Sequence, residues 1–97
     1  MSEHAPGTAK ATVFIDNERV IVTEYRFAPG ANTGWHRHGH DYVIVPLTDG
    51  KVKLLTATGE NSAEMKKGEP YYRNEGVEHD VISDNAGAFA FVEIELK

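Results

Sequence analysis

Histidines at alternate positions offer the clearest chemistry in this sequence. His36, His38 and His40 are spaced by two residues, and His79 lies about forty residues further along the chain. On a β-strand, side chains two residues apart share a face, so the imidazoles of His36 and His38 can grip one ion from the same side. A closed sheet would be able to bring His79 opposite this pair, although the spacing alone does not show it.

Two other interpretations of these histidines stay open on spacing alone. His36 and His40 have the i, i+4 spacing that suits zinc on a helix, but Gly34 and Gly39 disfavour a helix there. A pair of histidines on a strand can also be a chance feature of a polar face. Imidazole is a ligand for Zn, Ni, Fe, Cu and Mn, so the residues do not choose the metal. His4 lies in the polar N-terminal stretch and is given no role.

Tyrosines and arginines supply the weaker candidates for catalysis. Tyr42, Tyr71 and Tyr72 can each place a phenol near a metal, where it can act as a general base, but strand tyrosines more commonly pack their rings. Arg73 is the better candidate for clamping a substrate carboxylate, with a solvated role as the alternative. Arg37 lies between two inward histidines and should point outward. Tyr42 and Arg73 are therefore the candidate catalytic residues.

Composition limits the classes of protein that this chain can belong to. With 97 residues it makes one domain, and with no cysteine it has neither disulfides nor zinc–thiolate sites. The net charge of −5 and the lack of clustered Lys and Arg argue against a nucleic-acid partner. No apolar run is long enough for a signal peptide or a membrane span, so we expect a cytoplasmic protein with no membrane partner.

The elements that must position the histidines are predicted to be short β-strands. We expect a loose arm over residues 1–9 and one domain over residues 10–97, made of eight to ten strands with turn signals every 8–12 residues. No window shows a helical period. The alternation in 19–27 is imperfect and leaves its register open. The expected strands cover residues 11–15, 19–27, 34–38, 42–47, 51–57, 60–67, 81–82 and 89–96.

Two segments of the sequence resemble the motifs of the cupin family. Gly30 is followed by five residues and then by His36, Arg37 and His38, with Gly50 closing the first motif. In the second, five residues separate Gly68 from the Asn74-Glu75-Gly76 turn, and two residues separate that turn from His79. The phrases Trp35-His36-Arg37-His38, Asp41-Tyr42-Val43-Ile44-Val45-Pro46 and the ending Phe91 to Lys97 resemble a subgroup of small bacterial cupins, some of them associated with β-alanine degradation.

The sequence departs from the family pattern at one ligand. The family's first motif carries a glutamate that should fall at Tyr42 or Val43, and neither is a carboxylate. His40, Asp41, Tyr42 or water are the alternatives for the vacant place. The proline and the asparagine of the second motif are replaced by Asn74 and Ser83.

The resemblance implies a fold, a cofactor and two kinds of function. The fold is all-β, a double-stranded β-helix or jelly-roll barrel, and His36, His38 and His79 would bind one divalent metal ion per chain (Zn, Ni, Fe or Mn). Trp35 would plug the barrel beside the metal or lie at a dimer contact. The protein would be an enzyme acting on a small anionic metabolite by isomerase, lyase or dioxygenase-type chemistry, or else a non-catalytic module or sensor for a metal or small-molecule ligand. We also expect a homodimer, with exchange of the N-terminal strand as one route.

Overall fold

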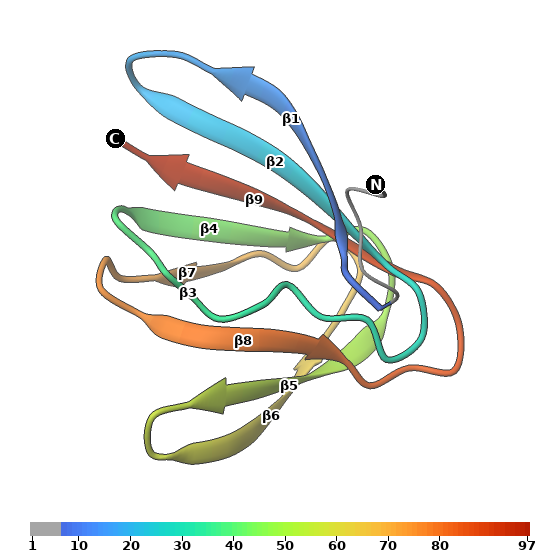
Figure 1. The fold of residues 1–97 in the computed structure, drawn as a ribbon. Coiled ribbons are helices and arrows are strands. Elements are labelled where there is room, and N and C mark those ends of the chain that lie inside the picture. Colours follow the sequence, from blue (N-terminus) through green and yellow to red (C-terminus); the bar gives the residue numbers. More distant parts are fainter. Residues whose placement is uncertain (1–6) are drawn as a thin grey trace, which may run out of the picture.

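Every regular element in the described part of the chain is a β-strand. The computed structural model describes residues 7–97 and contains nine strands in that range. They wind into one barrel (Figure 1). No helix within that range could cross a membrane. The strands are β1 (Lys10–Asp16), β2 (Val20–Phe27), β3 (His36–Arg37), β4 (Asp41–Pro46), β5 (Gly50–Thr56), β6 (Gly59–Met65), β7 (Tyr71–Arg73), β8 (Glu78–Ser83) and β9 (Phe89–Leu96).

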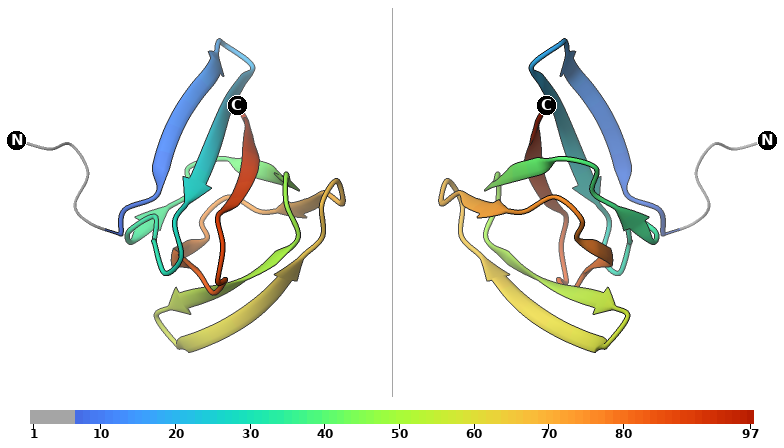
Figure 2. Two further views of the ribbon diagram at one scale, coloured as in Figure 1. Left: turned by 90° about the vertical axis from the view of Figure 1, so that its right-hand side faces the viewer. Right: turned by 90° about the vertical axis from the view of Figure 1, so that its left-hand side faces the viewer.

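The strands form two antiparallel sheets that face each other. One sheet has the order β1-β2-β9-β4-β7 and the other the order β3-β8-β5-β6. Strands distant in sequence therefore lie side by side, as β2 and β9 do in Figures 1 and 2. This arrangement confirms the predicted all-β jelly roll.

Several predicted elements differ in their bounds: the strand expected over residues 81–82 is β8, the one expected over 60–67 ends at Met65, and β7 is not among the expected strands. The strand expected over residues 34–38 shortens to His36–Arg37, because Gly34 adopts a φ of 89° and turns the chain just before it. Beyond β3, His38 keeps backbone hydrogen bonds to Val77 and Gly76. Of the expected arm, residues 1–6 and His4 among them lie outside the described residues. The carbonyl of Gly7 accepts a hydrogen bond from the amide of Asn32, and the amide of Ala9 donates one to the carbonyl of Asn32. Residues 7–9 are therefore paired with the barrel.

The register of β2 against β9 decides which residues fill the barrel. Phe27 lies opposite Phe89 and Tyr25 opposite Phe91, and these side chains point inward. The rings of Phe27, Phe89 and Phe91 contact one another with centroids 5.5–6.1 Å apart. Val20 and Val22 therefore face outward, which settles the alternation that the sequence leaves open. We call this cluster of three phenylalanines the aromatic end of the barrel.

The outer face of the five-stranded sheet carries one apolar row. Strand register places Ile15, Val22, Ile94, Val43 and Tyr72 directly opposite one another, one residue from each strand. Side chains at directly paired positions share a face of the sheet. The row thus crosses the whole outer surface, and its two ends, Ile15 and Tyr72, are about half exposed.

Candidate metal centre

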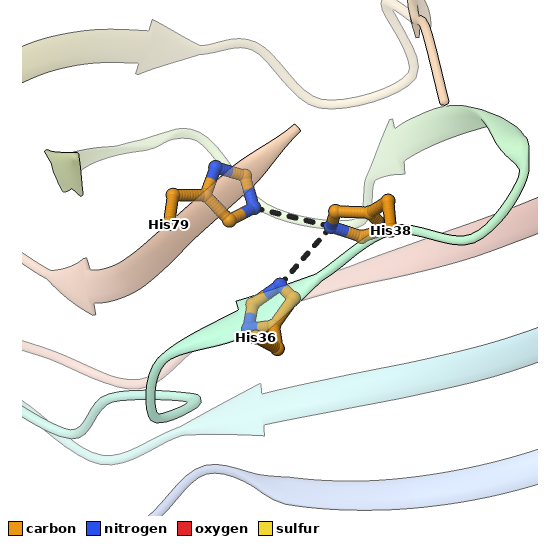
Figure 3. A group of neighbouring side chains, drawn as sticks. All are labelled: His36, His38 and His79. Carbon is orange, nitrogen blue, oxygen red and sulfur yellow. Dashed lines mark hydrogen bonds between the residues drawn. The ribbon is translucent and has the colours of Figure 1, made fainter. Parts of the chain in front are cut away.

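Three imidazoles meet inside the barrel, at the end opposite the aromatic cluster. His36 on β3 is paired directly with His79 on β8, and His38 reaches the same point from the segment after β3. The Nε2 atom of His38 lies 3.0 Å from Nε2 of His36 and 3.1 Å from Nε2 of His79 (Figure 3). The structure therefore brings together the three histidines that the sequence singles out.

The protonation of His36 is set by its neighbour in the preceding turn. Its Nδ1 lies 2.8 Å from the carbonyl oxygen of Gly34, which can only accept a hydrogen bond. Nδ1 of His36 therefore carries the proton, and Nε2 presents a lone pair to the other two rings. A single Nε2–H on His38 can serve only one of its two neighbours, so at least one lone pair at this point is left without a donor.

This donor set fits a divalent metal ion. Two nitrogens that each lie about 2.1 Å from one ion, at right angles, are about 3 Å apart. The separations of 3.0 and 3.1 Å have that value, and the ligand atoms of all three histidines lie within 4.8 Å of one another. A cation at the centre would satisfy the convergent lone pairs.

Burial keeps two of the three rings neutral. His38 and His79 are buried, and desolvation is the main reason that the pKa of each falls to about 4; the positive charge that His36 can carry lowers both further. Neutral imidazole is the form that binds metals. The two side chains are thus held in the ligating form at neutral pH.

A cavity of about 150 Å³ adjoins the centre. His36 and His79 line it on one side, and Glu93 and Arg73 also face it. Much of the remaining wall is apolar, and includes Ile44, Leu54, Met65, Val77, Val81 and Phe91. A cavity of this size has room for a small molecule beside the histidines.

The tyrosines around the cavity are held in their protonated form. Burial raises the pKa of Tyr71 to about 12 and also raises the pKa of Tyr42. Tyr42 is buried, and its ring stacks on that of His38 with centroids 3.8 Å apart. Near neutral pH the phenol is therefore present rather than the tyrosinate, and the contact that the structure gives Tyr42 is packing against His38.

Arg73 lies where a cavity ligand could reach it. Its guanidinium carbon is 4.4 Å from the centre of the Tyr71 ring, and Nη1 donates a 3.0 Å hydrogen bond to the carbonyl of Tyr72. These contacts hold the side chain at the cavity wall and leave its other donors available to an anion.

None of the protein groups considered for the vacant glutamate position supplies a carboxylate to the centre. Val43 faces outward in the apolar row, and Asp41 accepts hydrogen bonds from the Tyr72 hydroxyl and the Glu75 amide. His40 instead has its Nδ1 atom 3.4 Å from Oε2 of Glu95. Tyr42 points inward but offers a phenol.

Glu93 is a titratable group beside the centre that the sequence does not single out. It is 5 % exposed, and its Oε1 lies 3.8 Å from Nδ1 of His38. Desolvation is the first cause that raises the pKa of Glu93 to about 7, followed by the charge of Glu95 and a hydrogen bond between the two carboxyl groups. The alternation of side chains along a strand could have indicated this. Residues 89, 91, 93 and 95 share one face of β9, so Glu93 and Glu95 lie on the same inward face as Phe89 and Phe91.

Three flanking residues lie outside the centre. Arg37 points outward, 3.7 Å from Glu78, and Asp80 accepts hydrogen bonds from Asn32 and from the amide of Gly34. Trp35 is 53 % exposed, so it does not plug the barrel, and its alternative place at a dimer contact stays a prediction. The barrel interior beside His38 is filled instead by Tyr42.

The jelly-roll barrel, with its motif histidines gathered in the interior, identifies the class of protein, and the chain belongs to the cupin family. It is 57 % identical over 89 residues to BauB, a β-alanine degradation protein of Pseudomonas aeruginosa, and the match covers 92 % of this chain and 94 % of that protein. A cupin domain from Bordetella pertussis, known from a crystal structure, is 54 % identical with a TM-score of 0.91, over 93 % of this chain and 94 % of that one.

A more distant structure shows the same fold. A double-stranded β-helix protein from Klebsiella pneumoniae is 18 % identical with a TM-score of 0.78, and covers 97 % of this chain and 81 % of that one. At this identity the likeness concerns the fold alone. No family model matches the sequence.

Proposed function

We propose that this cupin binds one divalent metal ion through His36, His38 and His79 and acts on a small carboxylate in the adjoining cavity. The observation that carries the proposal is the meeting of three Nε2 atoms, with the Gly34 carbonyl fixing the lone pair of His36 inward. A bound ion would polarise a carbonyl or carboxylate oxygen of the substrate. Zn, Ni, Fe and Mn all suit a site of this kind.

The cavity residues support a small anionic substrate. Arg73 offers a guanidinium for a carboxylate, and the apolar wall suits a short carbon chain. The name of the Pseudomonas relative adds that three-carbon acids related to β-alanine are the first compounds to test. Glu93, a titratable group beside the cavity, favours an enzyme over a non-catalytic binding module or sensor.

Elemental analysis of tag-free protein tests the metal site. We expect about one ion per chain in the wild type and loss of that ion in His36→Ala and His79→Ala, because each removes one of three ligands. His40→Ala is the matched control, since His40 contacts Glu95 and not the centre. Unchanged metal content in His79→Ala would refute the site.

Calorimetric titration of the metal-loaded protein with β-alanine and other three-carbon carboxylates tests the substrate class. We expect Arg73→Gln to weaken binding at least tenfold, while Arg26→Gln leaves it unchanged because Arg26 pairs with Glu24 on the outer face. A compound that binds and is never turned over would favour the sensor alternative. Equal affinity in the wild type and Arg73→Gln would exclude Arg73 as the anion clamp.

We also propose that the chain forms a homodimer through the outer face of the five-stranded sheet. Ile15 on the edge strand β1 pairs with the outward-facing Val22 and is 46 % exposed, and the apolar row continues from it across the sheet. Five strands about 4.8 Å apart and about 23 Å long make a face of roughly 550 Å² before side-chain relief is counted, comparable to the ~800 Å² that each partner buries in a standard interface. A second copy of this face is the occupant that matches it.

Light scattering after size-exclusion chromatography tests the dimer. The substitution Ile94→Glu, at the centre of the row, should yield monomers, whereas Lys53→Glu in the four-stranded sheet should not. Monomeric wild-type protein at micromolar concentration would refute the proposal. Dissociation by deletion of residues 1–9 alone, with Ile94→Glu still dimeric, would point to strand exchange instead.

A further inference from the structure

His38 differs from His36 in what holds its ring. Nδ1 of His36 donates to the Gly34 carbonyl, while Nδ1 of His38 has no hydrogen bond to any described residue. The group that faces this nitrogen is the carboxyl of Glu93, at 3.8 Å, and both side chains are more than nine-tenths buried. Glu95 also has a carboxylate oxygen within 4.8 Å of a ring nitrogen of His38, but Glu95 is less buried and lies 3.4 Å from Nδ1 of His40. Glu93 is therefore the more deeply buried carboxyl group on the Nδ1 side of His38.

Glu93 is not explained by the packing of the barrel. Its directly paired neighbours, Thr23 and Ile44, carry no charge, and among the described residues His38 is its only ion-pair partner. Removing a carboxylate from water without a cation is costly, and Gln or an apolar residue would fill the same space at less cost. A buried carboxyl at this position calls for a function.

The other carboxylates near the centre are engaged elsewhere. Asp80 is bound by Asn32 and Gly34, Glu78 pairs with Arg37, and Asp41 is bound by Tyr72 and Glu75. These contacts place them outside the cluster of imidazoles. Glu93 alone among these four faces a ligand histidine from inside the barrel.

We propose that Glu93 is the positioning residue of the metal centre, and that β9 thereby supplies the negative charge that the first motif has lost. This inference rests on the proposed function. In this role the carboxylate of Glu93 accepts a hydrogen bond from Nδ1–H of His38. This contact keeps the proton on Nδ1, so the Nε2 lone pair of the ring points to the ion. The same negative charge offsets the ion, in a site where three neutral imidazoles supply none.

Binding of Co²⁺ alone to the metal-free protein tests this role. Loss of a carboxylate behind a ligand histidine costs about 10–100-fold in metal affinity. We expect Glu93→Gln to weaken Co²⁺ binding by that factor and to alter the visible absorption spectrum of the bound ion, with partial recovery in Glu93→Asp. The control is Glu78→Gln, which removes the same charge outside the barrel and should change the affinity less than twofold.

Nitrogen NMR of the Zn²⁺-loaded wild type keeps the test independent of how the variants fold. We expect a protonated Nδ1 and a metal-bound Nε2 on His38; an unprotonated Nδ1 would overturn the inference, as would a Glu93→Gln variant with wild-type Co²⁺ affinity and spectrum. Failure of the underlying metal site looks different. In that case the wild type binds no Co²⁺, or His79→Ala binds it as tightly as the wild type.

Discussion

The two ends of the barrel are built from the same strands but bury opposite kinds of side chain. Along β9, Phe89 and Phe91 fill the aromatic end, and Glu93 and Glu95 continue the same inward phase toward the histidines. Successive inward positions on a strand lie about 6.7 Å apart, so the phenylalanine core at Phe91 and the buried carboxyl of Glu93 are separated by only that distance along β9. We call the half with His36, His38, His79 and Glu93 the polar end.

This comparison separates stability from chemistry. The aromatic end is closed by packed rings and has no titratable group among its three phenylalanines, so it should carry the free energy of folding. The polar end has an open cavity and concentrates the groups with shifted pKa values, which is typical of a functional site. Substitutions at the two ends should therefore have different signatures.

The largest effect should come from opening the aromatic end. Phe89 is 1 % exposed, and Phe89→Ala should lower the free energy of unfolding by about 3–5 kcal/mol in a urea titration, because it leaves a cavity. The exposed Trp35 provides the control, since Trp35→Ala should change it by no more than about 0.5 kcal/mol. A loss below about 1 kcal/mol in Phe89→Ala would mean that this end does not dominate stability.

At the polar end, stability should depend on metal instead. A free metal concentration 100 times the Kd should raise the free energy of unfolding by about 2.7 kcal/mol, because only the folded state assembles the three ligands. Differential scanning calorimetry with and without a saturating chelator measures the change in Tm. His79→Ala should show no metal-dependent shift. Identical Tm values for metal-bound and metal-free wild type would show that the polar end does not depend on metal for its stability.

A smaller decrease in the free energy of unfolding should follow from adding a methyl group to the packed aromatic end. A Cβ at Gly50 would lie 2.6 Å from Cδ1 of Phe89 and 2.7 Å from Oδ1 of Asn85. Gly50→Ala should therefore cost about 1–3 kcal/mol in chemical unfolding. Gly39→Ala is the matched control, because a Cβ there meets no atom within 4 Å. Equal stability of both variants would show that the packing around Phe89 yields easily.

The smallest effect concerns the phenols that surround the polar end. Burial raises the pKa of both Tyr25 and Tyr71 to about 12, so the folded state keeps protons that the unfolded chain releases near pH 10. Their contribution to stability is complete below pH 10 and is lost as the pH rises toward 12. Ultraviolet absorbance should show phenol ionisation delayed beyond pH 10, and Tyr71→Phe should remove one late step. Ionisation of all four tyrosines near pH 10 in folded protein would contradict this.

Much of the fold was predictable because strand signals are local. Alternating apolar residues and turn residues placed most strands within a few positions, and the motif spacing located the three histidines that meet. The register of β2 was not predictable, since both of its faces carry apolar residues and only pairing with β9 assigns Phe27 inward and Val22 outward.

The polar end was less predictable than the aromatic end. Glu93 was missed because a glutamate near the end of a chain suggests a solvated residue, and its burial follows from the long-range pairing of β9 with both β2 and β4. The expectation that Trp35 fills the barrel failed for the complementary reason, while a place at a dimer contact stays a prediction. A large aromatic side chain suggests the interior, but Tyr42 already occupies the space beside His38.

The shortest strand of the barrel gives the centre a second consequence. β3 is only two residues long, and its His36 sits directly across from His79. A slip of one residue would turn an imidazole out of the barrel, because alternate residues of a strand face opposite ways. An ion that binds both rings would therefore stabilise the observed register of β3 against β8 relative to registers shifted by one residue. Metal binding and the fixing of the β3–β8 register would then be coupled.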